Sequence, residues 1–243
     1  MRLRLIIAYD GRPYSGWQSQ RSANTIQDIL EKAFQNVAGT HITVHGAGRT
    51  DAGVHALGQC AHADVFAKMN PSEWRRALNA NLPPTIRVMK SSQAVRSFHA
   101  RFSARGKVYR YLIRNGPILP PHEFGRVWHV PQALQLDVLR PALTCLAGQH
   151  DFRAFSAQSG KLSSDTIRTI QKTSLAHRGG LLTLTFQGNG FLYKMVRMLT
   201  AAVIRVGQGR DSLESLESRL ETGRPKWNHV APPDGLTLMR ILY

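Results

Sequence analysis

The sequence contains little cysteine, few acidic residues and no long apolar run. Its two cysteines, Cys60 and Cys145, lie in apolar stretches, so we expect buried free thiols in a reducing compartment and not a disulfide framework. No apolar run approaches the roughly 18 residues of a membrane-spanning helix. The N-terminus leads directly into a strand pattern, without the apolar core of a signal peptide. These absences predict a cytoplasmic protein that does not enter a membrane.

The shortage of acidic residues leaves a strong positive charge. The chain has 32 Lys and Arg against 15 Asp and Glu, a formal net charge of +17, and 24 of the basic residues are Arg. Such an excess predicts a polyanionic partner, with nucleic acid as the default. Because Arg binds phosphates in a bidentate manner and stacks on bases, the bias favours RNA. A generally basic proteome or a thermophilic habit would also raise the charge, so composition alone does not decide.

The 243 residues are 42% hydrophobic, which is enough for one large domain or two small ones. Apolar residues at helical spacing predict a helix over 26–38, with Thr25 and Asp28 as a capping pair and Gly39 as its end. Further helices are expected near 71–79, 137–147, 191–206 and 212–221, and strands near 2–9, 41–49, 58–66, 85–95, 108–114, 166–177, 181–189 and 236–242. The order predicts an α+β fold of two ferredoxin-like halves, 1–103 and 104–243, that share a continuous, mostly antiparallel sheet.

The segment from Gly48 to Ala56, G-R-T-D-A-G-V-H-A, is the most informative stretch. It places one carboxylate, Asp51, between Arg49 and a glycine-bounded turn at the end of a strand. A neighbouring arginine keeps a carboxylate ionised, and a turn can present it as a nucleophile or a base. The alternative is an Asx turn, in which Asp51 bonds its own backbone and Gly53 supplies a positive φ.

Other segments extend this motif along nearly the whole chain. They are Y-D-G-R-P-Y-S-G-W-Q-S-Q (9–20), N-A-N-L-P (79–83), F-H-A-R-F-S-A (98–104), K-V-Y-R-Y (107–111), G-Q-H-D-F-R-A-F (148–155), N-G-F-L-Y-K-M-V-R (189–197) and D-G-L-T-L (234–238). Together and in this order, they resemble the motifs of the TruA-type tRNA pseudouridine synthases. One departure is Thr237, where that family has an aromatic residue.

The resemblance implies a reaction as well as a fold. It implies isomerisation of uridine to pseudouridine at positions 38–40 in the anticodon stem-loop of tRNA, by a homodimer with a central basic cleft between its halves. The N-glycosidic bond breaks and a carbon–carbon bond forms to the same ribose, so no cofactor or metal is expected. Asp51 would be the catalytic nucleophile, attacking either the sugar or the uracil ring. The target base would be flipped out of its stack.

The same resemblance assigns roles to four further residues. Tyr109 would stack on the flipped uracil, Arg197 would pair with the catalytic carboxylate, and Leu238 would form an apolar wall. Arg49 would pair with Asp51 and contact the RNA backbone. The basic residues expected to contact RNA phosphates are Arg12, Arg101, Arg105, Lys107, Arg110, Lys161 and Lys194.

Two other classes of protein fit part of the sequence. A metal-dependent nuclease could use His45, His55, Cys60 and His62 as ligands beside Asp51, but the chain has neither a C-x-x-C nor an H-E-x-x-H motif. A non-catalytic RNA-binding protein would explain the charge equally well. It would not explain the R-T-D-A-G carboxylate together with the tyrosine and arginine motifs.

Overall fold

The computed structural model describes residues 1–21, 23–66, 68–157 and 165–243. They form two compact units, of which the first comprises Met1–Arg105 with Thr237–Tyr243 and the second Gly106–Leu236. The division expected from the sequence, 1–103 and 104–243, placed the last strand in the second half. The structure groups most of that strand with the first unit, because it pairs there in parallel with an N-terminal strand.

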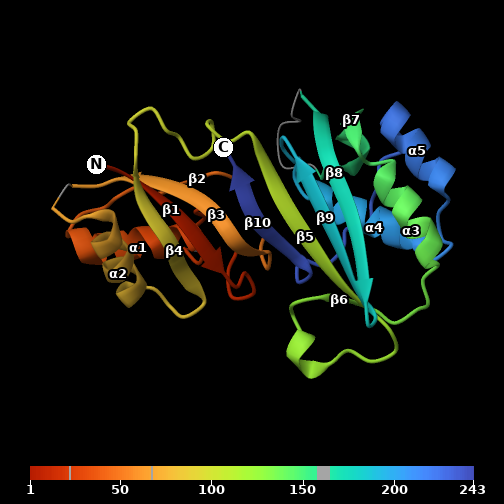
Figure 1. The fold of residues 1–243 in the computed structure, drawn as a ribbon, viewed down its shortest axis with the longest axis horizontal. Coiled ribbons are helices and arrows are strands. Elements are labelled where there is room, and N and C mark those ends of the chain that lie inside the picture. The colour runs from red at the N-terminus through yellow and green to blue at the C-terminus, as the bar shows by residue number, and fades with distance from the viewer. Residues whose placement is uncertain (22, 67, 158–164) are drawn as a thin grey trace. The chain divides into compact units, whose positions relative to one another are not determined.

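The first unit has a ferredoxin-like arrangement (Figure 1). Its elements are β1 (Arg2–Tyr9), α1 (Ile26–Ala38), β2 (His45–Gly46), β3 (His55–Asp64), α2 (Pro71–Asn81), β4 (Ile86–Ala94) and β10 (Leu236–Leu242). Strand β1 lies between β4 and β3 and is antiparallel to both, while β2 is antiparallel to β3. Helices α1 and α2 pack together through Phe34 and Trp74, whose ring centroids are 5.6 Å apart.

Helix α1 begins and ends where its sequence signals predict. The Thr25 side chain accepts a hydrogen bond from the backbone N–H of Asp28, and the Asp28 carboxylate accepts one from the backbone N–H of Thr25. Gly39 follows the helix with a φ of 74°, a left-handed conformation that suits glycine. The buried face carries Ile26, Leu30, Ala33 and Phe34, which are spaced to lie on one side of the helix. The predicted helix and both of its ends are confirmed.

The strand expected over 41–49 is wrong except for its centre, since only His45–Gly46 is a strand. The backbone N–H of Val44 donates to the Glu31 side chain on α1 (2.9 Å), and the backbone carbonyl of Gly48 accepts from the Gln59 side chain (2.7 Å). Side chains therefore satisfy backbone groups that a longer ladder would have used. The strand expected near 58–66 begins three residues earlier, at His55.

In the second unit the described residues form eight α-helices and β-strands, besides two short 3-10 helices, Pro121–Glu123 and Phe152–Phe155. The eight are β5 (Gly106–Asn115), β6 (Trp128–Val130), α3 (Leu136–Thr144), β7 (Gly148–Asp151), β8 (Ile167–Arg178), β9 (Leu181–Gly188), α4 (Met195–Gly207) and α5 (Leu213–Thr222). Strands β5, β9, β8 and β7 are neighbours in that order and pair antiparallel, and β6 joins β5 in parallel. Helices α3, α4 and α5 lie beside this sheet (Figure 1).

The predicted α+β class of mostly antiparallel strands is confirmed. The second unit follows the order β5-α3-β8-β9-α4, the first five elements of the ferredoxin-like pattern. Strands β6 and β7 were not predicted, because three or four residues are too short for an alternating pattern to stand out. Every described helix is too short or too polar to reach across a bilayer, and the longest, α1 and α4, have 13 residues.

Candidate active site

Asp51 lies on a tight turn that leads into β3. The backbone N–H of Val54 donates to the carbonyl of Asp51 (3.1 Å), and Gly53 has a φ of 80°. This backbone bond closes the turn, and the Asp51 side chain is half-buried on it. The structure thus places Asp51 at a strand end, where the sequence predicted it.

The N-terminal motif, residues 9–20, packs against the backbone of this turn. A Cβ atom at Gly11 would lie 2.1 Å from the carbonyl oxygen of Val54, and one at Gly16 would lie 2.7 Å from that of Thr50. Gly16 also has a φ of 93°. The backbone N–H of Trp17 donates to the carbonyl of Thr50 (3.0 Å). Only glycine permits these approaches, so the motifs around residues 9–20 and 48–56 form one structure.

A charged cluster continues along the same loop. The Arg12 guanidinium binds the Asp10 carboxylate, with Nε 3.0 Å from Oδ1, and these hydrogen bonds hold the pKa of Asp10 below its usual range. His55, the first residue of β3, accepts a hydrogen bond at Nδ1 from the backbone N–H of Gly11 (3.3 Å). Arg12, an expected phosphate contact, therefore also orders the loop that packs on the Asp51 turn.

Arg49 and Leu238 belong to the same unit as Asp51. The exposed Arg49 donates from Nε to Oε1 of Gln18 (3.3 Å), so the structure gives it a partner in the N-terminal loop. Leu238 is fully buried on β10, opposite Ala56 of β3 in a parallel pair. Its neighbour Thr237, at the position where an aromatic residue was expected, is also buried.

Tyr109 and Arg197 lie in the second unit. Tyr109 is a buried residue of β5 whose ring meets that of Phe191 edge to face, with centroids 5.3 Å apart. Arg197, in the first turn of α4, donates from Nε to the carbonyl of Ala231 (2.8 Å), and the Ala231 N–H donates to the Arg197 carbonyl (3.2 Å). Asp51, Arg49 and Leu238 are thus grouped in one unit, and Tyr109 and Arg197 in the other.

Tyr111 is a neighbour of this second group that sequence reasoning did not single out. It lies two residues beyond Tyr109 on β5, so both side chains point to the same face of the strand. Its hydroxyl donates to the carbonyl of Pro232 (2.5 Å), next to Ala231. Burial raises the pKa of Tyr111, and the nearby Arg197 charge partly opposes that rise. The K-V-Y-R-Y motif contained both tyrosines, so alternation along the strand could have indicated the pair.

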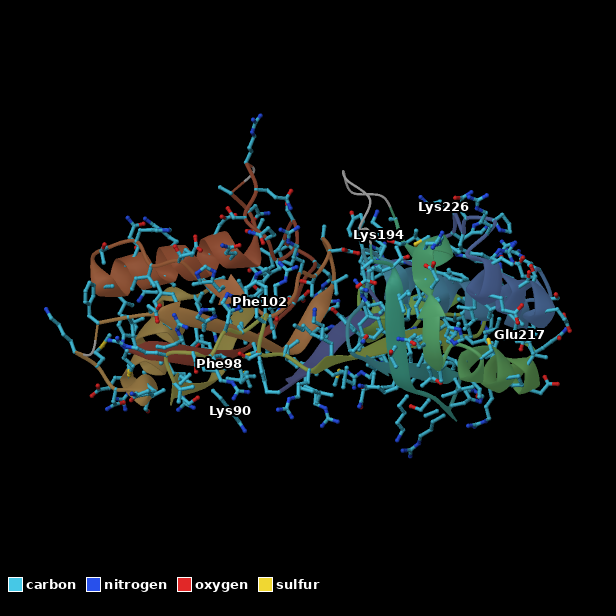
Figure 2. The ribbon with its side chains drawn as sticks, turned by 90° about the horizontal axis from the view of Figure 1, so that it is seen from above. Lys90, Phe98, Phe102, Lys194, Glu217 and Lys226 are labelled. Carbon is cyan, nitrogen blue, oxygen red and sulfur yellow. The ribbon has the colours of Figure 1, made fainter. Side chains whose placement is uncertain are left out.

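The basic residues expected at the RNA backbone are scattered over both units. Lys194 precedes α4 with a φ of 59°, and its Nζ lies 5.1 Å from the ring centroid of Tyr193 (Figure 2). Arg101 lies over the ring of Phe102, 5.8 Å from its centroid. Lys107 and Arg110 are half-buried on β5, and Arg105 directly precedes that strand. Lys161 lies outside the described residues. No contact with RNA is tested by these positions, which stay predictions.

The histidines of the rival metal site are engaged in other ways. His62 accepts at Nδ1 from the backbone N–H of Ala100 (3.2 Å), and its ring stacks on that of His45 at 4.9 Å. His55 Nδ1 is occupied by Gly11. Within the part of the chain that the structure describes, no group of three or more His, Cys, Asp or Glu side chains is arranged to hold a metal ion. The geometry of these donors does not favour the nuclease hypothesis.

Comparison with known proteins agrees with the motifs. The family model for tRNA pseudouridine synthase matches residues 5–103 and 142–243. The chain is 47% identical over 251 residues to tRNA pseudouridine synthase A of Akkermansia muciniphila, covering 100% of this chain and 95% of that protein. It is 39% identical over 244 residues to the protein of that name from Geobacillus sp., covering 100% and 98% of the two chains. A third relative, from Methylacidiphilum infernorum, is 38% identical over 241 residues, covering 99% and 94%. The chain therefore belongs to the tRNA pseudouridine synthase family.

Proposed function

We propose that this isomerase converts uridine to pseudouridine in the anticodon stem-loop of tRNA, at positions 38–40, with Asp51 as its nucleophile. The observation that carries the proposal is the Asp51 turn itself. Asp51 stands on the turn that leads into β3, and a glycine-containing loop packs against the backbone of this turn. A carboxylate held in this way is suited to attack, because its orientation is set before the substrate arrives.

The reaction needs one ionised carboxylate and a held base. The N-glycosidic bond from N1 of uracil to C1′ breaks, the uracil turns, and its C5 bonds to the same C1′. The C5 proton is lost and N1 gains one, so atoms and charge balance without a redox cofactor. Asp51 attacks either C1′ or the uracil ring, and both routes require the anionic form of the side chain.

A uridine within a folded RNA reaches the carboxylate only after leaving its stack, so the proposal includes base flipping. The resemblance assigns the flipped uracil to Tyr109 and the carboxylate partner to Arg197. Support for these roles lies in how each residue is fixed: the Tyr109 ring packs against Phe191, and Arg197 is bonded to Ala231. A tyrosine ring packed against a neighbouring ring keeps one orientation, as a stacking platform requires.

The net charge of +17 supports tRNA as the partner, through phosphate contacts that are independent of base sequence. The homodimer, the central basic cleft and the cytoplasmic location remain predictions that follow from the resemblance and from tRNA as substrate. A non-catalytic RNA-binding protein would have the same charge but no need for the Asp51 turn.

The test is Asp51→Asn, which is nearly isosteric and removes the anion. We expect tRNA affinity and thermal stability to stay close to wild type, while pseudouridine formation on unmodified tRNA is lost. Asp64→Asn is the matched control, because Asp64 is an acidic residue of the same unit whose partner is Arg2 at the surface. This control should retain full activity. If Asp51→Asn kept more than a few per cent of the wild-type rate, the assignment of the nucleophile would be wrong.

A further inference from the structure

A buried layer of hydrogen bonds holds the Asp51 turn. The hydroxyl groups of Tyr9 and Thr50 are 2.8 Å apart, and the Gln59 amide donates from Nε2 to the carbonyl of Gly48 (2.7 Å). Tyr9 is 4% exposed, Thr50 6% and Gln59 0%. These bonds attach Gly48 and Thr50, which precede Asp51, to Gln59 on β3 and Tyr9 on β1.

The layer is anchored on rigid elements. Tyr9 is the last residue of β1, and Gln59 lies on β3, which pairs antiparallel with β1 (Figure 1). Each anchor therefore stands on a strand that is fixed by its own ladder of hydrogen bonds. The turn lacks such a ladder, so its position depends on what it is bonded to.

The chemistry of Tyr9 matches a fixed support and not an acid or base. Burial raises the pKa of Tyr9 to about 12, partly offset by hydrogen bonds with Thr50 and Gln59. The phenol therefore stays protonated at neutral pH and keeps its hydrogen bond to Thr50 throughout the working range. A buried hydroxyl is costly to leave without a partner, which favours this one arrangement of the turn.

We propose that Tyr9 is a positioning residue, which holds the Asp51 carboxylate in its reactive orientation through its hydrogen bond to Thr50. This inference rests on the proposed role of Asp51. A displacement of about 1 Å at a reacting group can lower a rate by about 100-fold, so loss of one such bond should lower the rate as well as the stability.

The experiment measures single-turnover pseudouridine formation and tRNA affinity for Tyr9→Phe, Thr50→Val and Thr50→Ser. Tyr9→Phe and Thr50→Val each remove one hydroxyl of the pair, and we expect single-turnover rates about 10-fold lower with unchanged affinity. Thr50→Ser keeps the hydroxyl and should restore most of the rate. The double variant Tyr9→Phe/Thr50→Val should be no slower than either single variant, because both remove the same bond.

Tyr243→Phe is the matched control, since Tyr243 belongs to the same unit and donates its hydroxyl to the carbonyl of Ala100 (2.8 Å), outside the loop that packs on the Asp51 turn. It should lower the thermal midpoint about as much as Tyr9→Phe but leave the rate unchanged. Three results would overturn the inference: a wild-type rate for Tyr9→Phe, an equal loss of rate for Tyr243→Phe, or a Thr50→Ser variant as slow as Thr50→Val.

The test also separates this inference from the proposed function. If Asp51→Asn is inactive and Tyr9→Phe is fully active, only the positioning role fails. If Asp51→Asn is active, the nucleophile is wrong whatever Tyr9→Phe does. Should Tyr9→Phe fail to fold, the comparison of Thr50→Ser with Thr50→Val still decides, because these side chains differ in the hydroxyl that carries the claim.

Discussion

The two units present their candidate catalytic residues on different kinds of structure. In the first unit Asp51 stands on a turn between a two-residue strand and β3. In the second, Tyr109 stands inside a ten-residue strand and Arg197 in the first turn of a 13-residue helix. A residue on a helix or strand is held in position by the backbone hydrogen bonds of that element. A residue on a turn depends on contacts with other parts of the chain.

Those supports come from distant parts of the sequence. The loop around Gly11 and Gly16 precedes the turn by about 40 residues, and it contacts the backbone at Thr50 and Val54. In the second unit, Arg197 is linked by reciprocal bonds to Ala231 and Tyr111 by one bond to Pro232, but both residues already stand on a helix or a strand. The difference predicts that the first unit is the more sensitive to substitutions outside the catalytic residues themselves.

Gly11→Ala is expected to have the largest effect of this kind. Its Cβ atom would lie 2.1 Å from the carbonyl oxygen of Val54, so the loop or the turn must move. We expect the single-turnover rate to fall about 100-fold, the loss that a misplacement of about 1 Å can cause. Gly39→Ala is the control, because a Cβ there meets nothing within 4 Å and only the positive φ is strained. It should cost about 1 kcal/mol of stability and leave the rate intact. Equal rates for both variants would refute the dependence on the loop.

Tyr109→Phe tests the second unit. It removes only the hydroxyl, and β5 should hold the phenylalanine ring where it holds the tyrosine ring. The variant keeps the ring and therefore its stacking on the base, which contributes roughly 1–3 kcal/mol, so the affinity for tRNA should not change. The turnover is expected to drop at least about 10-fold if the phenol helps to move the C5 proton, as we predict. Single-turnover rates and binding isotherms for wild type and variant decide the matter. Unchanged turnover would leave the ring as a stacking platform only, and loss of binding alone would contradict both roles.

The contrast between the units also explains what the sequence could predict. Helix α1 was predicted with both ends, because Thr25, Asp28 and Gly39 act within a few residues of the helix. The strand expected over 41–49 was wrong, because side chains bind two of its backbone groups. Glu31 accepts from the N–H of Val44, 13 residues away, and Gln59 donates to the carbonyl of Gly48, 11 residues away. A local pattern does not reveal such long-range competition.

The candidate site shows the same limit. Asp51 was chosen from its motif, and the structure places it on the turn that the motif predicted. The support of that turn by Tyr9, Thr50 and Gln59 was not predicted, since a tyrosine in an alternating strand gives no sign of its partner. The role of Gly11 and Gly16 was likewise hidden, because close backbone approach is a property of the fold and not of the spacing.

A smaller effect is expected from Arg105, the last residue of the first unit before the chain enters the second, and Lys107, the second residue of β5. If both contact RNA phosphates, replacing the two with Ala should flatten the salt dependence of tRNA affinity by about 1–2 on a log–log plot. The single-turnover rate at saturating enzyme should hardly change, because neither is proposed to touch the reacting base. Salt titrations of wild type and double variant measure the slope. An unchanged slope would place both outside the RNA path, and a collapsed rate at full binding would show that they position the site.

The last prediction concerns a second non-regular segment of the first unit, which contains Phe98 and Phe102 (Figure 2). It is bonded to the sheet at His62, whose Nδ1 accepts from the backbone N–H of Ala100. Burial lowers the pKa of His62 to about 4, and the nearby rings of His99 and His45 add to this effect. A protonated Nδ1 would no longer accept the bond, so the segment depends on a neutral histidine.

The sign of the pH dependence follows from that pKa. Unfolded His62 binds a proton below about pH 6.5, while the folded protein resists it until about pH 4, so stability is lost as the pH falls through this interval. We expect a loss of about 1–3 kcal/mol between pH 7 and pH 4, measured by urea unfolding. His62→Gln keeps an acceptor that does not titrate, and it should flatten this part of the pH profile. His41→Gln, at an exposed position of the same unit, should not. A profile that is equally steep in both variants would show that the acid sensitivity of the first unit arises elsewhere. Since the bond from Ala100 to His62 is not one of those that hold Gly48 and Thr50, His62→Gln should leave the rate at neutral pH unchanged, unlike the variants that loosen the turn.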